Sequence, residues 1–144
     1  MQKRPVSSLS ENKLLIDTYE TGPLGGVLTA FEYDEHTAWL VVACDMPFVN
    51  TATFDFLIHH RSPEHIATAF KNPLTQLPEP LLSIWEPTSY YFLKEAYQNG
   101  QRSPLKILHN TDSHLIDCPD EHWLWNANTV EEFTQMANIL AQCK

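Results

Sequence analysis

Apolar and polar residues are grouped along the chain in short segments that predict an α/β domain. Short apolar runs favour strands, and apolar positions spaced by three or four residues favour helices. We expect strands at 13–17, 38–44, 66–71, 80–85 and 113–117, and helices at 24–34, 51–60, 88–98, 103–109 and 129–142. This alternation predicts a mostly parallel sheet with helices on both faces, formed by one domain over 14–144 after a lead segment at 1–13.

Two helix starts carry recognisable caps. Asn50 or Thr51 is suited to cap the second helix, because both side chains accept hydrogen bonds from backbone amides. The segment 129–132 reads as a capping box, which would begin the last helix. That helix carries an apolar stripe, which predicts that one of its faces packs against the domain. The stripe consists of Val130, Phe133, Ala137, Leu140 and Ala141.

The run from Trp39 to Cys44 is apolar without alternation, which is typical of a strand covered on both faces. Asp45 follows this strand directly, and Pro47 ends the extended segment. In open α/β sheets ligands bind at the carboxyl ends of strands, and Mg²⁺ takes one or two carboxylates together with phosphate oxygens. Asp45 is therefore a candidate metal ligand. An aspartate that caps the next helix or turns the chain fits the same pattern.

Three of the four glycines lie in one turn, 22–26, which follows a short apolar run at 14–16. Glycine permits close approach of the backbone to a ligand, and amides at a helix start favour anions. A tight connection from a strand to a helix explains the glycines equally well. Asp17 ends the apolar run beside this turn, so we expect it to lie near Asp45.

Composition excludes several classes of protein. The chain has 144 residues, 43% of them hydrophobic, which is sufficient for one core, and a formal net charge of -9, which argues against nucleic acid as a partner. It contains no apolar run of membrane-spanning length and no apolar signal region after its basic start, so we expect a cytoplasmic protein. Three cysteines without paired spacing read as reduced thiols, and His59 and His60 read as the end of a surface helix.

A series of motifs in fixed order gives the chain a family resemblance. The glycine turn at 22–26 is followed by Ala43-Cys-Asp-Met-Pro-Phe-Val49 and then by Glu79-Pro-Leu-Leu82. Gly100-Gln-Arg-Ser103 and Asn126-Ala-Asn-Thr-Val-Glu-Glu132 complete the series. In this order the motifs resemble the molybdenum cofactor guanylyltransferases, the MobA-type nucleotidyltransferases. The resemblance implies a Rossmann-like nucleotidyltransferase fold and covers nearly all of the chain from Leu14 onward.

The resemblance also implies an activity, transfer of GMP from GTP to molybdopterin, and assigns roles to residues. Asp45 would be the catalytic residue and hold Mg²⁺. Asp17 and the turn of Gly22, Pro23, Leu24, Gly25 and Gly26 would bind the nucleotide, whereas Arg102, Asn126 and Asn128 would bind the pterin. Plain structural roles compete with these assignments: Asp17 as a turn residue, Arg102 as a surface arginine and both asparagines as caps. Trp125, beside Asn126, is the tryptophan best placed to face a ligand.

One family motif has no match in this sequence, namely the Gly-rich loop that cradles the nucleotide triphosphate. We therefore expect an amino-terminally truncated member that transfers GMP poorly by itself. A related pterin cytidylyltransferase, or a remnant that binds the pterin cofactor or a partner protein without turnover, fits the same motifs. The expected partners are molybdoenzymes or other cofactor-biosynthesis proteins. An uncovered sheet edge would also lead to self-association.

Overall fold

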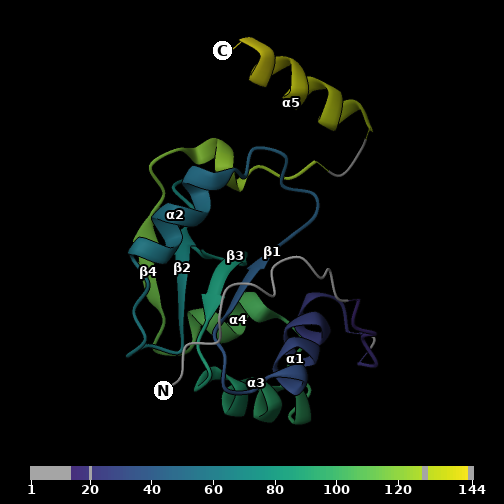
Figure 1. Ribbon diagram of the computed structural model, residues 1–144, viewed down its shortest axis with the longest axis vertical. Helices are drawn as coiled ribbons and strands as arrows, with labels where there is room; N and C mark the ends of the chain where they lie inside the picture. Colours follow the sequence, from purple (N-terminus) through teal and green to yellow (C-terminus); the bar gives the residue numbers. More distant parts are fainter. Residues whose placement is uncertain (1–13, 20, 128–129, 143–144) are drawn as a thin grey trace, which may run out of the picture.

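The computed structural model describes residues 14–19, 21–127 and 130–142 (Figure 1). Its sheet has four strands in the order β1-β3-β2-β4: β1 (Trp39–Val42), β2 (Ala67–Lys71), β3 (Pro78–Trp85) and β4 (His114–Asp117). β2 pairs with β4 in parallel, and β3 pairs antiparallel with both β1 and β2. β1, β2 and β4 therefore run in one direction, while β3 runs against them.

The reversed direction of β3 follows from its short connection to β2. Asn72 begins this turn, where its amide donates to the carbonyl of Leu77 at 2.8 Å and its side chain accepts hydrogen bonds from the amides of Leu74 and Thr75. A short hairpin forces its two strands to be antiparallel, because a parallel pair needs a long crossover. The predicted α/β class is confirmed, and three of the four strands share the direction expected for a mostly parallel sheet.

Helices cover both faces of the sheet, and each face has its own core. α1 (Pro23–Tyr33), α3 (Ser89–Gln98) and α4 (Pro104–His109) pack on one face, where Phe31, Leu93 and Leu108 meet Ala69 and Trp85. α2 (Thr51–His59) and the 3-10 helix η2 (Glu121–Leu124) pack on the other face. There the core contains Leu57, Phe70, Leu82, Ile84 and Trp123. The prediction of helices on both faces is confirmed.

Helix ends agree with the sequence where the structure describes them. Asn50 caps α2 by accepting a hydrogen bond from the Thr53 amide at 3.2 Å, while the Thr53 hydroxyl accepts from the Asn50 amide. His59 is the last residue of α2, as expected. The last helix is α5 (Val130–Gln142), which lies at one end of the molecule in Figure 1. Its predicted cap at Thr129 lies outside the described residues.

The apolar stripe of α5 is described only in part. Ala137 and Ala141 are exposed, and the side chains of the stripe's remaining residues lie outside the described part of the structure. Of the cysteines, Cys44 and Cys118 are free thiols, as predicted, and Cys143 lies outside the described residues.

One prediction about strands is wrong. Residues 14–17 form no strand, and Leu14 and Ile16 are 94% and 81% exposed. An apolar run becomes a strand only by pairing with a neighbour, and no described strand pairs with this segment. β1 is an edge strand, yet it has contacts on both faces as predicted: Trp39 and Val41 pack against one core and Leu40 against the other, while Val42 at its end is 42% exposed.

Candidate functional site

Three loops meet at the end of the sheet where β1, β2 and β4 finish, which we call the carboxyl edge (Figure 1). One loop, 43–50, leads from β1 to α2, and a second, 72–77, leads from β2 to the start of β3. The third, 118–127, follows β4 and contains η2. Because the loops at the carboxyl ends of strands bind ligands in α/β sheets, the carboxyl edge is the candidate ligand-binding site.

Asp45 lies at this edge in a half-buried turn. Met46 and Phe48 anchor the turn, since each is only 6% exposed. The structure decides one of the alternatives left open by the sequence: Asn50, and not Asp45, caps α2. The carboxylate of Asp45 is therefore not used as a helix cap.

Glu79 is a second carboxylate at the same edge, and the sequence analysis did not single it out. Burial raises the pKa of Glu79, the charge of Asp45 raises this pKa further, and the hydrogen bond that Glu79 accepts from the Leu81 amide at 3.2 Å opposes the rise. Glu79 at the start of β3 is therefore near enough to Asp45, which follows the paired strand β1, for the charge of Asp45 to affect its pKa. Among the described residues no group of three or more His, Cys, Asp or Glu side chains is placed to hold a metal. A pair of carboxylates suits Mg²⁺, which keeps water and phosphate oxygens as its other ligands.

The loop that carries the first predicted asparagine is tied directly to Asp45. The amide of Ala127 donates a hydrogen bond to the carbonyl oxygen of Asp45 at 2.7 Å, which brings exposed Asn126 to the acidic loop. Aromatic rings make a second connection, because Phe48 and Trp125 meet edge-on with centroids 5.8 Å apart. The structure therefore places Asn126 beside Asp45. Asn128 lies outside the described residues.

The glycine turn forms the start of α1. Gly22, at a φ of 66°, is the N-cap, Pro23 is the first helical residue, and the fully buried Leu24 packs into the core. Gly25 faces the carboxylate of Asp17, which a methyl group at this position would meet. Asp17 also accepts a hydrogen bond from the Tyr19 amide at 2.8 Å. The carboxylate thus lies against the first turn of α1, where helix amides favour negative charge.

Arg102 lies near this second group of residues. Its guanidinium stacks on the ring of Tyr97 at 4.1 Å and donates a hydrogen bond to the Tyr97 carbonyl at 2.6 Å. Tyr97 in turn meets Tyr19 edge-on, with centroids 5.0 Å apart. Burial raises the pKa of Tyr19, as does the hydrogen bond that its hydroxyl donates to Glu32. The aromatic contacts therefore connect Arg102 to the side of the molecule that carries Asp17 and Gly25.

The predicted site residues thus form two groups in the described structure. One contains Asp45 and Asn126, and the other contains Asp17, the glycine turn and Arg102. No hydrogen bond or ion pair between described residues joins Asp17 to Asp45. The sequence analysis also did not identify the contacts of Phe48 with His122 and Trp125. The only sign of this aromatic cluster in the sequence is that Phe48 lies three residues after the candidate ligand Asp45.

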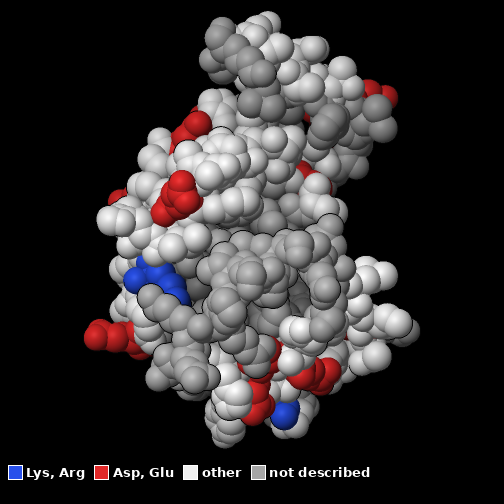
Figure 2. All heavy atoms as spheres, viewed as in Figure 1, with Lys and Arg blue, Asp and Glu red and all other residues white. Residues whose placement is uncertain are grey.

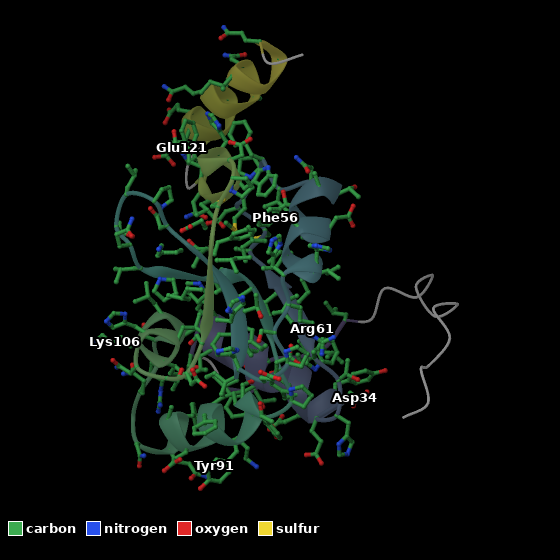
Figure 3. All side chains as sticks on the ribbon, turned by 90° about the vertical axis from the view of Figure 1, so that its left-hand side faces the viewer. Asp34, Phe56, Arg61, Tyr91, Lys106 and Glu121 are labelled. Carbon is green, nitrogen blue, oxygen red and sulfur yellow. The ribbon has the colours of Figure 1, made fainter. Side chains whose placement is uncertain are left out.

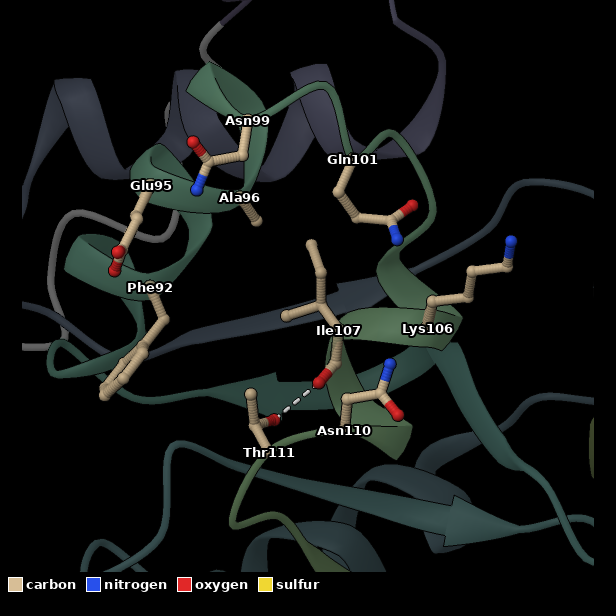
Figure 4. Close-up of a pocket in the computed structure, with 9 residues that line it drawn as sticks. All are labelled: Phe92, Glu95, Ala96, Asn99, Gln101, Lys106, Ile107, Asn110 and Thr111. Carbon is tan, nitrogen blue, oxygen red and sulfur yellow. Dashed lines mark hydrogen bonds between the residues drawn. The ribbon is translucent and has the colours of Figure 1, made fainter.

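A separate hollow of about 230 Å³ lies between α3 and α4, and Figure 4 shows its lining. Ile107 forms its apolar floor, and the amide side chains of Asn99, Gln101 and Asn110 surround it. It contains none of the predicted site residues. The face drawn in Figure 2 shows several separate acidic side chains and few basic ones, in keeping with the negative net charge.

The chain is an α/β domain in which Asp45 follows the carboxyl end of β1 and Glu79 lies at the start of the neighbouring β3. The model of the MobA-like NTP transferase domain family matches residues 6–114, and the chain belongs to this family. The sequence is similar to a "Molybdenum cofactor biosynthesis bifunctional protein" from Synechocystis, with 30% identity over 85% of this chain and 35% of the relative. It is also similar to a "Molybdenum cofactor guanylyltransferase" from Pseudomonas fluorescens, with 30% identity over 76% of this chain and 55% of the relative.

Two solved structures share the fold. A molybdopterin-guanine dinucleotide biosynthesis protein A from Archaeoglobus fulgidus superposes with a TM-score of 0.68 and 22% identity, over 84% of this chain and 64% of that one. A protein from Aquifex aeolicus also gives a TM-score of 0.68, with 18% identity over 80% of this chain and 61% of that one. The chain spans about a third to a half of the two relatives named above. Within the described residues no helix has the length and apolar character needed to cross a membrane.

Proposed function

We propose that this chain is a molybdenum cofactor guanylyltransferase of the MobA type, which uses GTP and molybdopterin as substrates. The observation that carries the proposal is the hydrogen bond between the Asp45 carbonyl and the Ala127 amide. This bond holds the acidic loop, where a metal and phosphates would bind, against the asparagine loop that the family resemblance assigns to the pterin. A transferase needs its two substrates side by side, and this contact provides such a junction.

Asp45 and Glu79 would hold a bound Mg²⁺, since Asp45 is half-buried after β1 and its charge acts on the nearby Glu79 carboxyl. When bound, the ion would neutralise phosphate charge, including the charge that builds up in the transition state. The proposed reaction is attack by the terminal phosphate oxygen of molybdopterin on the α-phosphorus of GTP. The new P–O bond forms as the bond to pyrophosphate breaks, so GMP is transferred and pyrophosphate leaves. The role of the chain is to position the reacting groups.

The other residues take binding roles in this proposal. Asn126 and Asn128 hold the pterin, while the backbone at Gly22–Gly26 shapes the nucleotide wall. Arg102 keeps guanidinium donors beyond those used by the Tyr97 and Gln101 carbonyls, so it can still bind a phosphate. The proposed partners are small-molecule substrates together with molybdoenzymes or cofactor-biosynthesis proteins, in a cytoplasmic setting.

One observation favours a second candidate, a chain that binds the pterin without turnover. Asp17 lies against the first turn of α1, where the nucleotide phosphates would otherwise meet helix amides. The asparagine loop beside Asp45, by contrast, is already in place. A cytidylyltransferase for the same pterin is a third candidate, because the sequence has no match to the family's Gly-rich nucleotide loop from which the choice of base could be inferred.

The test is to incubate the purified chain with Mg²⁺ and molybdopterin, add GTP or CTP, and separate the products by chromatography. We expect the guanine dinucleotide, formed slowly. Formation of the cytosine dinucleotide would support the cytidylyltransferase. Pterin binding without any dinucleotide would support the binding protein. Absence of pterin binding at millimolar concentration would contradict all three functions.

A further inference from the structure

His122 is held in a defined orientation at the edge that carries Asp45. A single carboxylate oxygen of Asp120 accepts hydrogen bonds from the His122 amide at 3.0 Å and from its Nδ1 at 2.7 Å. Because an ionised carboxylate can only accept, Nδ1 must be the nitrogen that carries the proton. The second ring nitrogen, Nε2, has no hydrogen-bond partner among the described residues. The His122 side chain is 37% exposed, so a ligand can reach the ring.

Two aromatic rings fix the imidazole further and connect it to the acidic loop. The His122 ring lies 4.4 Å from that of Trp125 and 5.6 Å from that of Phe48, measured between centroids. Phe48 is three residues after Asp45, and Trp125 directly precedes Asn126. The imidazole therefore contacts one residue of each of the two segments that the hydrogen bond from Ala127 to Asp45 joins. The ring is thus held in one orientation by the N-cap residue of η2 and by two aromatic neighbours.

The charges around this edge leave a role for such a ring. The chain has a net charge of -9, and most of its described lysines and arginines are engaged or lie elsewhere. Arg61 pairs with Glu86, and Lys71 pairs with Asp117 at 3.3 Å. Arg102 is stacked on Tyr97 at the end of α3. A phosphate group beside Asp45 would thus meet few cationic side chains besides the proposed Mg²⁺, and His122 is an oriented side chain at the same edge.

We infer that His122 binds the phosphate of the acceptor molecule through Nε2. A phosphomonoester can bring its own proton to Nε2, or a protonated ring can donate to a phosphate oxygen. The same hydrogen bond forms in both cases, with the single proton on either atom. In both cases the hydrogen bond from Nδ1 to Asp120 keeps the ring in the same orientation. This inference rests on the proposed function, because it assumes that a phosphorylated pterin is the acceptor.

The experiment compares two probes, hydroxymethylpterin phosphate and hydroxymethylpterin, whose only difference is the phosphate. Binding to the whole chain is measured by calorimetry, and the ¹⁵N resonance of His122 Nε2 is followed by NMR. We expect the phosphorylated probe to bind more tightly and to shift this resonance. His122→Asn keeps a donor for Asp120 but removes Nε2, and should weaken binding of the phosphorylated probe by about tenfold. His122→Gln extends an amide towards the Nε2 position and should retain most of the affinity. His109→Asn, at an exposed histidine of α4, is the matched control.

The outcomes separate this inference from the proposed function. Equal binding of both probes, or tight phosphate-dependent binding that His122→Asn leaves unchanged, would overturn the role of His122 while leaving pterin binding intact. Failure of both probes to bind would contradict the proposed function itself. The resonance shift in the unmodified chain keeps the test valid if a variant folds poorly: an unshifted Nε2 signal at saturating phosphorylated probe would overturn the inference.

Discussion

The carbonyl oxygen of Asp45 and the amide of Ala127 form a hydrogen bond of 2.7 Å between segments about eighty residues apart in the sequence. This bond joins the loop after β1 to the loop after β4 at one edge of the sheet. It uses the backbone of Asp45 and leaves the carboxylate available to a metal. The loop proposed to bind the nucleotide is thereby held against the loop proposed to bind the pterin, as group transfer between the two would require.

Asp45→Asn should abolish Mg²⁺-dependent nucleotide binding while leaving the fold intact. The substitution keeps the shape of the side chain and the backbone bond to Ala127 but removes the negative charge that would hold the ion. Calorimetric titration of GTP with and without Mg²⁺ measures the effect, and circular dichroism checks the fold. Asp117→Asn, at the same edge but paired with Lys71, is the matched control and should bind as the unmodified chain does. Unchanged Mg²⁺-dependent affinity in Asp45→Asn would leave Asp45 as a turn residue only.

Asp45→Asn should also lower the pKa of Glu79, since the charge of Asp45 contributes to raising this pKa. A carboxyl group whose pKa is higher in the folded than in the unfolded protein binds protons preferentially in the folded state. Its contribution therefore favours folding as the pH falls through the folded pKa and disfavours folding above it. Glu79→Gln should accordingly raise stability at neutral pH and flatten the pH dependence. Urea denaturation between pH 4 and pH 8 measures this, and an unchanged pH profile would contradict the interaction.

Several features of this site could be predicted from the sequence because they are local. The apolar run that ends at Asp45 and the cap at Asn50 depend on neighbouring residues, and the structure shows both at the expected positions. The predicted strand at 13–17 was wrong because a strand requires pairing with another strand, and apolar character alone does not supply it. Glu79 was missed because its distinguishing property, the proximity of Asp45 across two strands, depends on how β1 pairs with β3. The contacts of His122 likewise involve Phe48, which lies far away in sequence.

Arg61→Met should destabilise the fold by about 2 kcal/mol, because it would leave a carboxylate uncompensated in the protein interior. Glu86 is 2% exposed and receives two hydrogen bonds, at 2.7 and 2.8 Å, from the guanidinium of Arg61, which is labelled in Figure 3. We place the expected loss below that of a fully buried pair because the Arg61 side chain is 41% exposed. Urea denaturation gives the loss. The double variant Arg61→Met with Glu86→Gln should recover part of it, whereas equal stability of the single variant and the unmodified chain would show that the pair contributes nothing.

Two glycines of the turn at 22–26 should respond in opposite ways to alanine. Gly22 has a φ of 66°, a conformation that strains other residues, so Gly22→Ala should cost about 1 kcal/mol. Gly26 lies inside α1, and a methyl group there meets no atom within 4 Å. Gly26→Ala should therefore stabilise the protein by up to about 1 kcal/mol through helix propensity. Thermal unfolding of both variants measures the difference. A loss at Gly26 as large as that at Gly22 would mean that the turn has a different backbone conformation.

We expect the chain to self-associate through the unpaired side of the edge strand β1. Among the described strands, β1 pairs only with β3, so its other side presents unpaired backbone groups. Val42 of this strand is 42% exposed, and the nearby loops contain no described strand that covers it. Such an edge recruits strands from other molecules, and a charged side chain on it opposes that pairing. We expect light scattering at micromolar concentration to detect dimers or larger species, and Val42→Lys to reduce them. Val42→Thr, which keeps the size and strand preference of the side chain without adding charge, is the matched control and should still associate. A monodisperse monomer of the unmodified chain would show that this edge is closed in solution.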